Sequence, residues 1–167
     1  YHDRVMSSRA LVGMASIYKE QGDVHKSLHL YQNVVQLTRD TEYRQGLSHS
    51  LHALGDLLLA LNKPRKALDH LLESTEVFAE LEDKESEAEV WEKIGNIYAQ
   101  NLQEHKDALA AWDKARNLQM ILDDQVSALE MLEKMGQLAR QQLGETNQAL
   151  KYFHNAFDLS VKLGDRS

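Results

Sequence analysis

Side chains that could bind a metal ion recur at helical spacings in this 167-residue chain. His49, His52 and Asp56 stand at i, i+3 and i+7, and imidazole and carboxylate groups are transition-metal ligands. On a helix, however, the first and last of the three would be about 10 Å apart along the axis, too far to share one ion. His25 and His29 form an i,i+4 pair without a clear third ligand. The sequence therefore predicts no metal site and no cofactor.

Catalytic motifs do not accompany these residues. The sequence contains no phosphate-binding Gly-rich loop, no Ser nucleophile elbow and no His-Glu-x2-His zinc motif. Its carboxylates are spread along the chain rather than concentrated in one candidate cleft. The sequence therefore predicts a protein that is not an enzyme, and binding becomes the favoured role.

Composition narrows the class of partner. Lys and Arg number 19 against 26 Asp and Glu, which gives a formal net charge of -7. Because neither half of the chain is basic, we expect no nucleic-acid partner. No apolar run reaches the roughly 20 residues of a membrane span, and the first residues lack the apolar core of a signal peptide. The chain contains no Cys, and we expect a cytoplasmic location.

Helical repeats must position these side chains. The stretch from Trp91 to Ala115 reads Trp-x2-Ile-Gly-x2-Tyr and then Ala-x3-Trp-x2-Ala, and this pattern occurs three more times. Apolar residues at helical spacing flank each copy, so each predicts a pair of helices. A column of small residues fixes the register at steps of 40, 40 and 41: Ala15, Gly55, Gly95 and Gly136.

The register predicts one array of four repeats, over residues 4–43, 44–83, 84–124 and 125–165. The eight predicted helices cover residues 4–20, 24–39, 44–60, 64–80, 84–101, 105–121, 125–142 and 146–163. Two inward-facing stripes are expected in the first repeat: Leu11, Met14, Ile17 and Tyr18 on one helix, and Leu28, Tyr31, Val34 and Val35 on the other. Trp91 and Trp112 should both pack where the helices of neighbouring repeats meet.

Turn signals separate the helices. Gly22 ends the first helix because Gly adopts the left-handed conformation at little steric cost. Pro64 suits the first turn of the helix that follows it. Ten residues separate corresponding core positions in the third and fourth repeats, whereas nine separate them in the first two. We therefore expect the turn in the third and fourth repeats to be one residue longer.

The pattern resembles the tetratricopeptide repeat (TPR), whose Trp-x2-Leu-Gly-x2-Tyr and Ala-x3-Phe signature it nearly repeats. The resemblance implies an all-α fold, a right-handed α-solenoid of four TPR-like helix-turn-helix repeats. A common TPR has about 34 residues and a Pro near the end of its second helix. The corresponding positions here carry no Pro, so both helices can extend further: Arg39, Ala79, Met120 and Val161.

This long repeat, with Leu-x-Asp at its junctions, is similar to the arrays of Pins-type polarity adaptors and of rapsyn. The sequence Ala53-Leu54-Gly55-Asp56 departs from the Asn-Leu-Gly-Asn of those adaptors. A further TPR subclass grips the carboxylate terminus of chaperone tails through Lys and Asn side chains four residues apart. Asp56 and Glu92 stand at such positions and would repel a carboxylate, so we expect no chaperone-tail binding.

The resemblance implies that the first helix of each repeat lines a concave groove. Short polar side chains at a fixed step can hydrogen bond the backbone of an extended peptide, and a solenoid commonly binds through this face. The alternative is that these are solvated helix positions. The predicted groove residues are Arg9, Ser16, His49, His52, Asp56, Glu89, Glu92, Asn96, Glu130, Glu133 and Gln137.

Two first helices share the motif Glu-x2-Glu-Lys, at residues 89–93 and 130–134. One interpretation is solubility with i,i+4 Glu–Lys support, worth about 0.2–0.5 kcal/mol per pair. The other is an acidic lip that attracts Lys or Arg of a ligand. The partner would then be a basic segment of protein.

We therefore predict a protein-interaction scaffold or adaptor that holds a partner segment in the groove. Two alternatives remain open: a structural or self-association module that uses the array's ends or convex face, and a regulatory domain of a larger enzyme. The last helix carries three apolar residues outside its packing column: Leu150, Phe157 and Val161. We expect weak self-association through this C-terminal end, no membrane insertion, and a chain cut from a longer protein.

Overall fold

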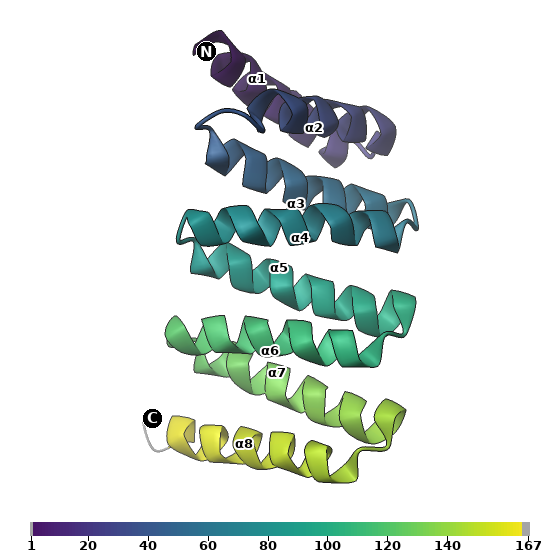
Figure 1. The fold of residues 1–167 in the computed structure, drawn as a ribbon, viewed down its shortest axis with the longest axis vertical. Helices are drawn as coiled ribbons and strands as arrows, with labels where there is room; N and C mark the ends of the chain where they lie inside the picture. Colours follow the sequence, from purple (N-terminus) through teal and green to yellow (C-terminus); the bar gives the residue numbers. More distant parts are fainter. Residues whose placement is uncertain (1, 165–167) are drawn as a thin grey trace. The chain divides into compact units, whose positions relative to one another are not determined.

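The structure is a computed structural model that describes residues 2–164. This part of the chain consists of eight α-helices in sequential antiparallel pairs, with π-helical turns at the ends of two of them (Figure 1). Residue 165, the predicted end of the fourth repeat, lies outside the described residues. The elements in order are α1 (His2–Glu20), α2 (Val24–Thr38), α3 (Arg44–Ala60), α4 (Pro64–Glu80), α5 (Lys84–Asn96), η1 (Ile97–Leu102), α6 (His105–Ile121), α7 (Gln125–Leu138), η2 (Ala139–Leu143) and α8 (Thr146–Gly164).

Helix ends agree closely with the sequence prediction because the local signals act as expected. Gly22 has φ +77°, and Asp23 caps α2 by accepting a hydrogen bond from the Lys26 backbone N–H. Pro64 occupies the first turn of α4. Among the described residues, no helix combines the length and apolar character that a membrane span needs.

The chain divides into two compact units, Tyr1–Asp83 and Lys84–Ser167. In the first unit α2 packs on α1 and α3, and α4 packs on α3. The apolar core is built around α3, whose leucines other than Leu59 are nearly inaccessible to solvent. Its fully buried members include Ala15, Leu47, Leu51 and Leu54, joined by Tyr31 and Val35 of α2.

The second unit repeats this order with α5, α6, α7 and α8. Trp112 and Ala108 of α6 pack against Met131 and Met135 of α7. A second cluster joins α7 and α8, and it contains Ala128, Leu132, Ala156 and Leu159. Trp112 is only 5% exposed, which confirms that it packs where two repeats meet.

Trp91 does not share this burial. Its indole is partly exposed, Nε1 donates to the Glu87 carboxylate at 3.2 Å, and Lys114 Nζ lies 3.7 Å from the ring centroid. These partners belong to its own helix and to α6 of the same repeat. The predicted packing between repeats is therefore confirmed for Trp112, whereas Trp91 is only partly buried.

The small-residue column marks the closest approach of the two helices in a repeat. A Cβ built on Gly95 would lie 2.3 Å from Trp112 Cδ1, and one on Gly55 would lie 2.5 Å from Leu71. Such distances are shorter than real carbon–carbon contacts, so neither position accepts a side chain without rearrangement. The column of small residues therefore lies where the two helices of a repeat approach each other closely.

The inward stripe predicted for α1 is wrong in part. Met14 is 47% exposed and Ile17 is 54% exposed, whereas Ser8 and Ala15 of the same helix are fully buried. The stripe was assigned from apolar character, but α1 turns its small residues toward α2. Ser27 of α2 donates to the Ala15 carbonyl oxygen at 2.8 Å, which requires this close approach. In α2, Tyr31, Val34 and Val35 are buried as predicted.

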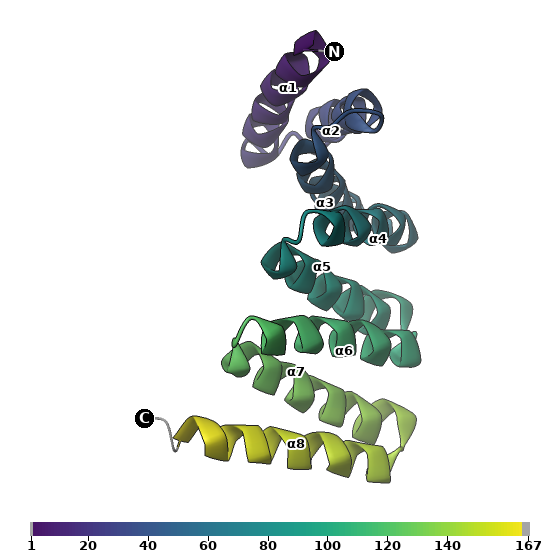
Figure 2. The same ribbon diagram turned by 60° about the vertical axis from the view of Figure 1, so that its left-hand side comes forward.

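The additional residue of the third and fourth repeats lies within a helix and not in the turn. Both first helices of the second unit end in π turns, η1 and η2, which take up one more residue per turn than an α-helix. Gln103 and Gly144 then adopt left-handed conformations, with φ of +58° and +67°. The additional residue was predicted correctly, but its predicted place in the turn is wrong. In both views the α5–α6 and α7–α8 connections lie on the same side of this unit (Figure 2).

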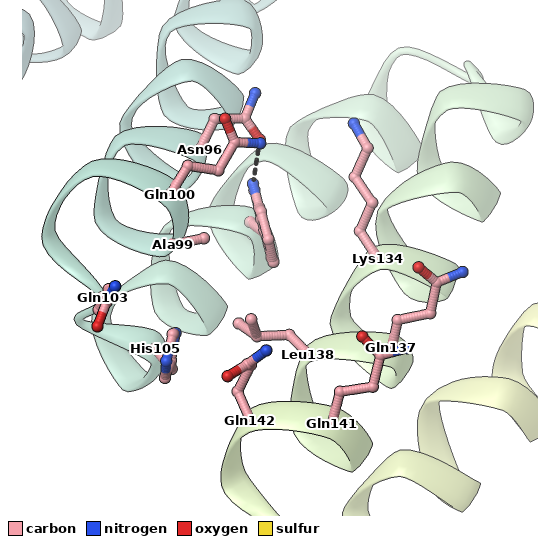
Figure 3. A pocket seen from close by; sticks show the side chains of 11 residues that line it. Asn96, Ala99, Gln100, Gln103, His105, Lys134, Gln137, Leu138, Gln141 and Gln142 are labelled. Carbon is pink, nitrogen blue, oxygen red and sulfur yellow. Dashed lines mark hydrogen bonds between the residues drawn. The ribbon is translucent and has the colours of Figure 1, made fainter.

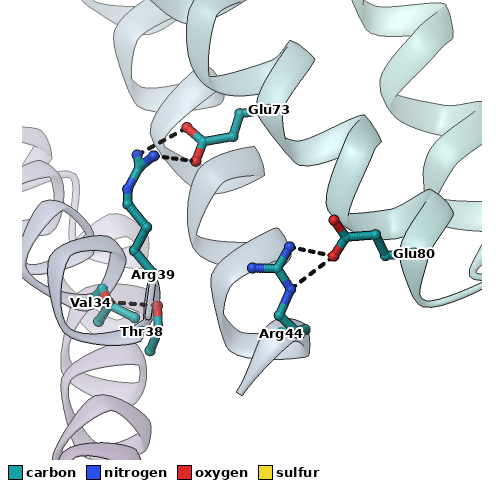
Figure 4. A network of polar contacts seen from close by, with 6 residues as sticks. All are labelled: Val34, Thr38, Arg39, Arg44, Glu73 and Glu80. Carbon is teal, nitrogen blue, oxygen red and sulfur yellow. Dashed lines mark hydrogen bonds and ion pairs between the residues drawn. The ribbon is translucent and has the colours of Figure 1, made fainter. Parts of the chain in front are cut away.

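Ion pairs join α4 to the connection between α2 and α3 and to the first residue of α3 (Figure 4). Arg39 binds both carboxylate oxygens of Glu73, at 2.7 and 3.0 Å, and Arg44 pairs with Glu80. The Thr38 hydroxyl donates to the Val34 carbonyl oxygen at 2.8 Å. These contacts fix a five-residue connection that has none of the Asp caps found before α2 and α7.

Candidate functional site

A pocket of about 480 Å³ opens between α5, η1 and α6 on one side and α7 and η2 on the other (Figure 3). All of its walls belong to the second unit. We call it the amide pocket, after its predominant side chains. It is lined by Asn96, Ala99, Gln100, Gln103, His105, Trp112, Lys134, Gln137, Leu138, Gln141 and Gln142.

Six of these eleven residues are Asn or Gln. Each primary amide offers an acceptor oxygen and two N–H donors, the same chemistry that a peptide backbone presents. Gln137, Gln141 and Gln142 line one side of the pocket, opposite Gln100 and Gln103 (Figure 3). Such walls can hydrogen bond a neutral, extended chain from both sides.

An indole orients one of these amides. Trp112 Nε1 donates to Asn96 Oδ1 at 3.2 Å (Figure 3). Because the Asn96 oxygen accepts this bond, its NH2 group is the end that can donate to a ligand. Trp112 is nearly buried in the core and cannot move freely, so Asn96 is held in a preset orientation. Leu138 adds an apolar surface to the pocket lining.

The two π turns supply part of the lining. Ala99 and Gln100 come from η1, and Gln141 and Gln142 come from η2. A π turn changes the direction of the side chains that follow it, and such turns are frequent at functional sites. The extra residue in each of these two repeats therefore shapes the pocket. The first two repeats have neither π turns nor this run of glutamines.

A charged bridge closes one side of the pocket. Lys134 Nζ lies 2.6 Å from Glu92 Oε1, which joins α7 to α5, the two first helices of this unit. Lys134 thus pairs with another repeat's Glu92 and not with Glu130 of its own helix. Glu130 and Glu133 remain exposed on α7.

One polar atom at the pocket has no partner in the described residues. His105 Nδ1 is buried without a hydrogen bond, and His105 lines the pocket. Buried polar atoms are nearly always satisfied. The atom is therefore a candidate to bond a ligand that enters the pocket.

The first unit has a smaller polar cluster on α1 and α3. Lys19 Nζ lies 3.2 Å from Asp56 Oδ2, and His52 Nε2 lies 4.0 Å from Asp56 Oδ1. Burial raises the pKa of the nearby Tyr31 phenol, while Lys19 and a hydrogen bond with Ser16 oppose that increase. Three predicted groove residues, Ser16, His52 and Asp56, therefore lie together, but Asp56 is already paired.

The remaining predicted residues of the first unit contact aromatic rings. The Arg9 guanidinium lies 5.4 Å from the centroid of Tyr43. The His49 ring meets Phe78 of α4 edge-on at 5.4 Å. His49 and His52 thus have separate partners. No group of three His, Asp or Glu side chains suited to a metal ion occurs in residues 2–164.

Some of the predicted groove residues lie at this candidate site. Asn96 and Gln137 line the amide pocket, and Glu92 adjoins it through Lys134. Glu89, Glu130 and Glu133 belong to the same helices but not to the lining. Sequence reasoning missed the residues contributed by the π turns, the loop after η1 and the start of α6, although the ten-residue spacing marked these segments: Ala99, Gln100, Gln103, His105, Gln141 and Gln142.

Comparison with known proteins agrees with this architecture. Residues 6–80 match the family model of the tetratricopeptide repeat. No curated protein matches the chain in sequence.

Solved structures share the fold at low sequence identity. BtubC (BKLC) from P. vanneervenii is 15% identical with a TM-score of 0.76, over 96% of this chain and 66% of that one. MamA is 17% identical with a TM-score of 0.70, over 95% of this chain and 81% of that one. Aspartyl phosphate phosphatase F from Bacillus subtilis is 16% identical with a TM-score of 0.73, over 97% of this chain and 42% of that one. The likeness establishes a TPR-like solenoid fold.

Proposed function

We propose that this chain is a scaffold or adaptor that binds an extended segment of a partner protein. The premise is that residues 6–80 match the family model of the tetratricopeptide repeat. TPR domains are generally protein–protein interaction modules. In the second unit the segment would bind along the first helices, α5 and α7, and its backbone would enter the amide pocket. The observation that carries the proposal is the pocket's lining of six primary amides.

The chemistry of the pocket supports a polypeptide ligand. An extended segment presents one N–H donor and one C=O acceptor per residue, and amide side chains can pair with both. Trp112 holds the Asn96 side chain in position before a ligand arrives. Preformed positions reduce the ordering cost of binding.

The charges around the pocket favour a segment with Lys or Arg. Glu130 and Glu133 are exposed on α7, and the chain carries a formal net charge of -7. Lys134 is engaged by Glu92, so it offers little attraction to an acidic ligand. Of the two interpretations of the Glu-x2-Glu-Lys motif, we therefore keep the acidic lip for Glu130 and Glu133, which would attract Lys or Arg of the ligand.

The first unit contributes less to the proposed contact. Asp56 could bind a cation of the partner only by exchanging it for Lys19, which lies 3.2 Å away. His52 and Ser16 flank this pair and can extend the contact along α1 and α3. The second unit should therefore dominate the affinity.

The finer family assignment rests on repeat length. Steps of 40 to 41 residues and Leu-x-Asp junctions support a long-repeat subtype, similar to Pins-type polarity adaptors and rapsyn. TPR domains are typically non-catalytic. One structural relative is a phosphatase by name, so the absence of catalysis in this chain stays a prediction.

The test begins with a displayed library of random linear peptides, selected on the purified chain. The affinity of the strongest binder is then measured for the parent and for Gln137→Ala and Gln141→Ala. We expect the variant that carries both substitutions to lose affinity about 5- to 150-fold, because two hydrogen bonds of about 0.5–1.5 kcal/mol each are removed. Circular dichroism would show that both variants remain folded.

Gln32→Ala provides the matched control, since Gln32 is an exposed glutamine on α2, outside the pocket lining. Its affinity should equal that of the parent. If no selected peptide loses affinity with the pocket variants, the pocket is not the binding site, and the structural or self-association alternative becomes the better explanation.

A further inference from the structure

The ion pair between Glu92 and Lys134 joins the two walls of the amide pocket. Lys134 Nζ lies 2.6 Å from Glu92 Oε1, and Lys134 lines the pocket together with Asn96 of the opposite wall. In Figure 3 the Lys134 side chain extends from α7 away from Gln137. An ammonium group of the chain itself therefore occupies the carboxylate beside the pocket.

Glu92 lies close to the amide that is oriented for a ligand. It precedes Asn96 by four residues on α5, a rise of about 6 Å along the helix. The Asn96 oxygen accepts from Trp112, so its NH2 group is left to donate to the backbone of a bound segment. An extended segment advances about 3.3 Å per residue. A side chain one or two residues from the backbone group bonded to Asn96 can therefore reach Glu92.

The pair can open at low cost because water reaches both of its members. The Lys134 side chain is 40% exposed and the Glu92 side chain is 31% exposed, and ion pairs with this exposure contribute little to stability. Glu130 lies one turn before Lys134 on α7, and a Glu four residues N-terminal to a Lys is a favourable helical pair. Opening the bridge therefore leaves neither charge buried and gives Lys134 a second carboxylate.

The first unit contains a pair of the same kind. Lys19 of α1 lies 3.2 Å from Asp56 of α3, so in both units a lysine of one first helix binds a carboxylate of the other first helix. The two pairs occupy different repeat positions, since Asp56 corresponds to Asn96 and not to Glu92. The repeat pattern alone therefore does not produce this arrangement.

We propose that Glu92 is a binding site for a Lys or Arg side chain of the partner segment, and that Lys134 competes with the segment for this site. The proposal rests on the proposed function, because the amide pocket must hold the segment. The ligand cation replaces the Lys134 ammonium group at Glu92, and Lys134 turns to Glu130. Glu92 then determines specificity at one position of the segment, and Lys134 lowers the affinity of the free chain for it.

Removal of the competing lysine tests the proposal. The strongest binder from the peptide library is titrated by calorimetry against the parent and against Lys134→Gln. The variant should bind about 1.5- to 5-fold more tightly, the factor that corresponds to an exposed ion pair. Addition of Glu92→Gln to this variant should reduce the affinity again by a similar factor. A bridge that only held α5 and α7 together would predict weaker or unchanged binding for Lys134→Gln. Circular dichroism checks that the variants remain folded.

Two controls separate competition at Glu92 from a general effect of charge. Lys151→Gln changes the net charge equally, and Lys151 is an exposed lysine of α8 outside the lining of the amide pocket; this variant should bind the peptide like the parent. The second control replaces each Lys or Arg of the peptide in turn with norleucine. The replacement that removes the cation bound to Glu92 should give a peptide with equal affinity for the parent and for Lys134→Gln.

Several results would overturn the proposal. A peptide that loses affinity with Gln137→Ala and Gln141→Ala, yet binds Lys134→Gln no more tightly than the parent, contradicts the competition and leaves the proposed function intact. A strongest binder without Lys or Arg, or equal tightening by Lys151→Gln, does the same. A peptide that keeps its full affinity for the variants Gln137→Ala and Gln141→Ala contradicts the proposed function, and this proposal with it.

Discussion

Trp112 connects the core of the second unit to its candidate site. Its ring packs on Met131 and Met135, occupies the space beside Gly95, and donates its N–H to Asn96 in the pocket wall. One side chain thus serves both stability and the geometry of binding. Substitutions around it should separate these two roles.

Trp112→Ala should lower the melting temperature far more than Trp91→Ala. Truncation of a buried Trp costs about 3–5 kcal/mol, and each kcal/mol shifts the midpoint by about 2–4 °C in a chain of this size. Trp91 is partly exposed and loses mainly its contacts with Glu87 and Lys114. Thermal unfolding followed by circular dichroism compares the two. Equal shifts would contradict the assigned burial.

Two glycines should respond in opposite directions to Ala. Gly95→Ala places a methyl group 2.3 Å from the Trp112 ring and should destabilise the second unit. Gly13 lies in α1 with nothing within 4 Å of the added Cβ. Gly13→Ala should therefore stabilise by about 0.5–1 kcal/mol, the difference in helix preference. Urea unfolding measures both changes, and a destabilised Gly13→Ala would show that α1 is packed differently.

His70 should make stability depend on pH. Burial lowers the pKa of His70 below its ordinary value of about 6.5, although Glu73 and Asp69 oppose the shift and Arg39 adds to it. The unfolded chain then binds more protons just below pH 6.5 than the folded chain does. The contribution of His70 to stability is complete above that pH and is lost as the pH falls below it.

His70→Gln should flatten this dependence. The free energy of unfolding of the parent and the variant is compared by urea titration at several pH values between about 5 and 7.5, the range in which a histidine titrates. His154→Gln is the control, since His154 is an exposed histidine of α8. An identical pH profile for parent and His70→Gln would contradict the assigned environment.

At the scale of elements, the π turns decide where the pocket forms. The first unit, with nine residues between its core positions, ends its first helices as plain α-helix. The second unit accommodates an additional residue in each repeat without a longer loop. The two π turns place Gln100, Gln141 and Gln142 in the lining of one pocket.

Deletion of Asn101 should remove the first π turn and leave the fold intact. Asn101 is exposed and does not line the pocket, and its loss restores the nine-residue spacing of the first two repeats. We expect a cooperative thermal transition close to that of the parent, with loss of binding to a selected peptide. Deletion of Gln21 in the α1–α2 turn is a control for shortening a connection outside the second unit. If the variant that lacks Asn101 keeps the affinity of the parent for the peptide, the π turn is not needed for the binding site.

Sequence patterns predicted the helices well because caps, turns and spacing are local. They placed the ends of α3, α4 and α6 at the observed residues. They could not show that Lys134 reaches Glu92 or that Lys19 reaches Asp56, since those pairs depend on how two helices lie together. The exposure of Met14 was missed for a related reason. The apolar character of a side chain does not show which helix packs against it.

At the scale of the whole molecule, the candidate binding surface lies in the second unit. The amide pocket and the exposed glutamates of α7 suit an extended, basic segment of another protein.

The most direct test of the proposed function is an NMR titration of the side-chain amides with the strongest selected peptide. At low salt the NH2 resonances of Asn96, Gln100, Gln137 and Gln141 should shift with one common dissociation constant, while those of Gln32 and Gln36 on α2 remain fixed. For a basic peptide the affinity should fall as salt is added, since exposed charges are screened over about 10 Å at 0.1 M. Saturating peptide binding that leaves the four pocket amides unshifted would contradict the account.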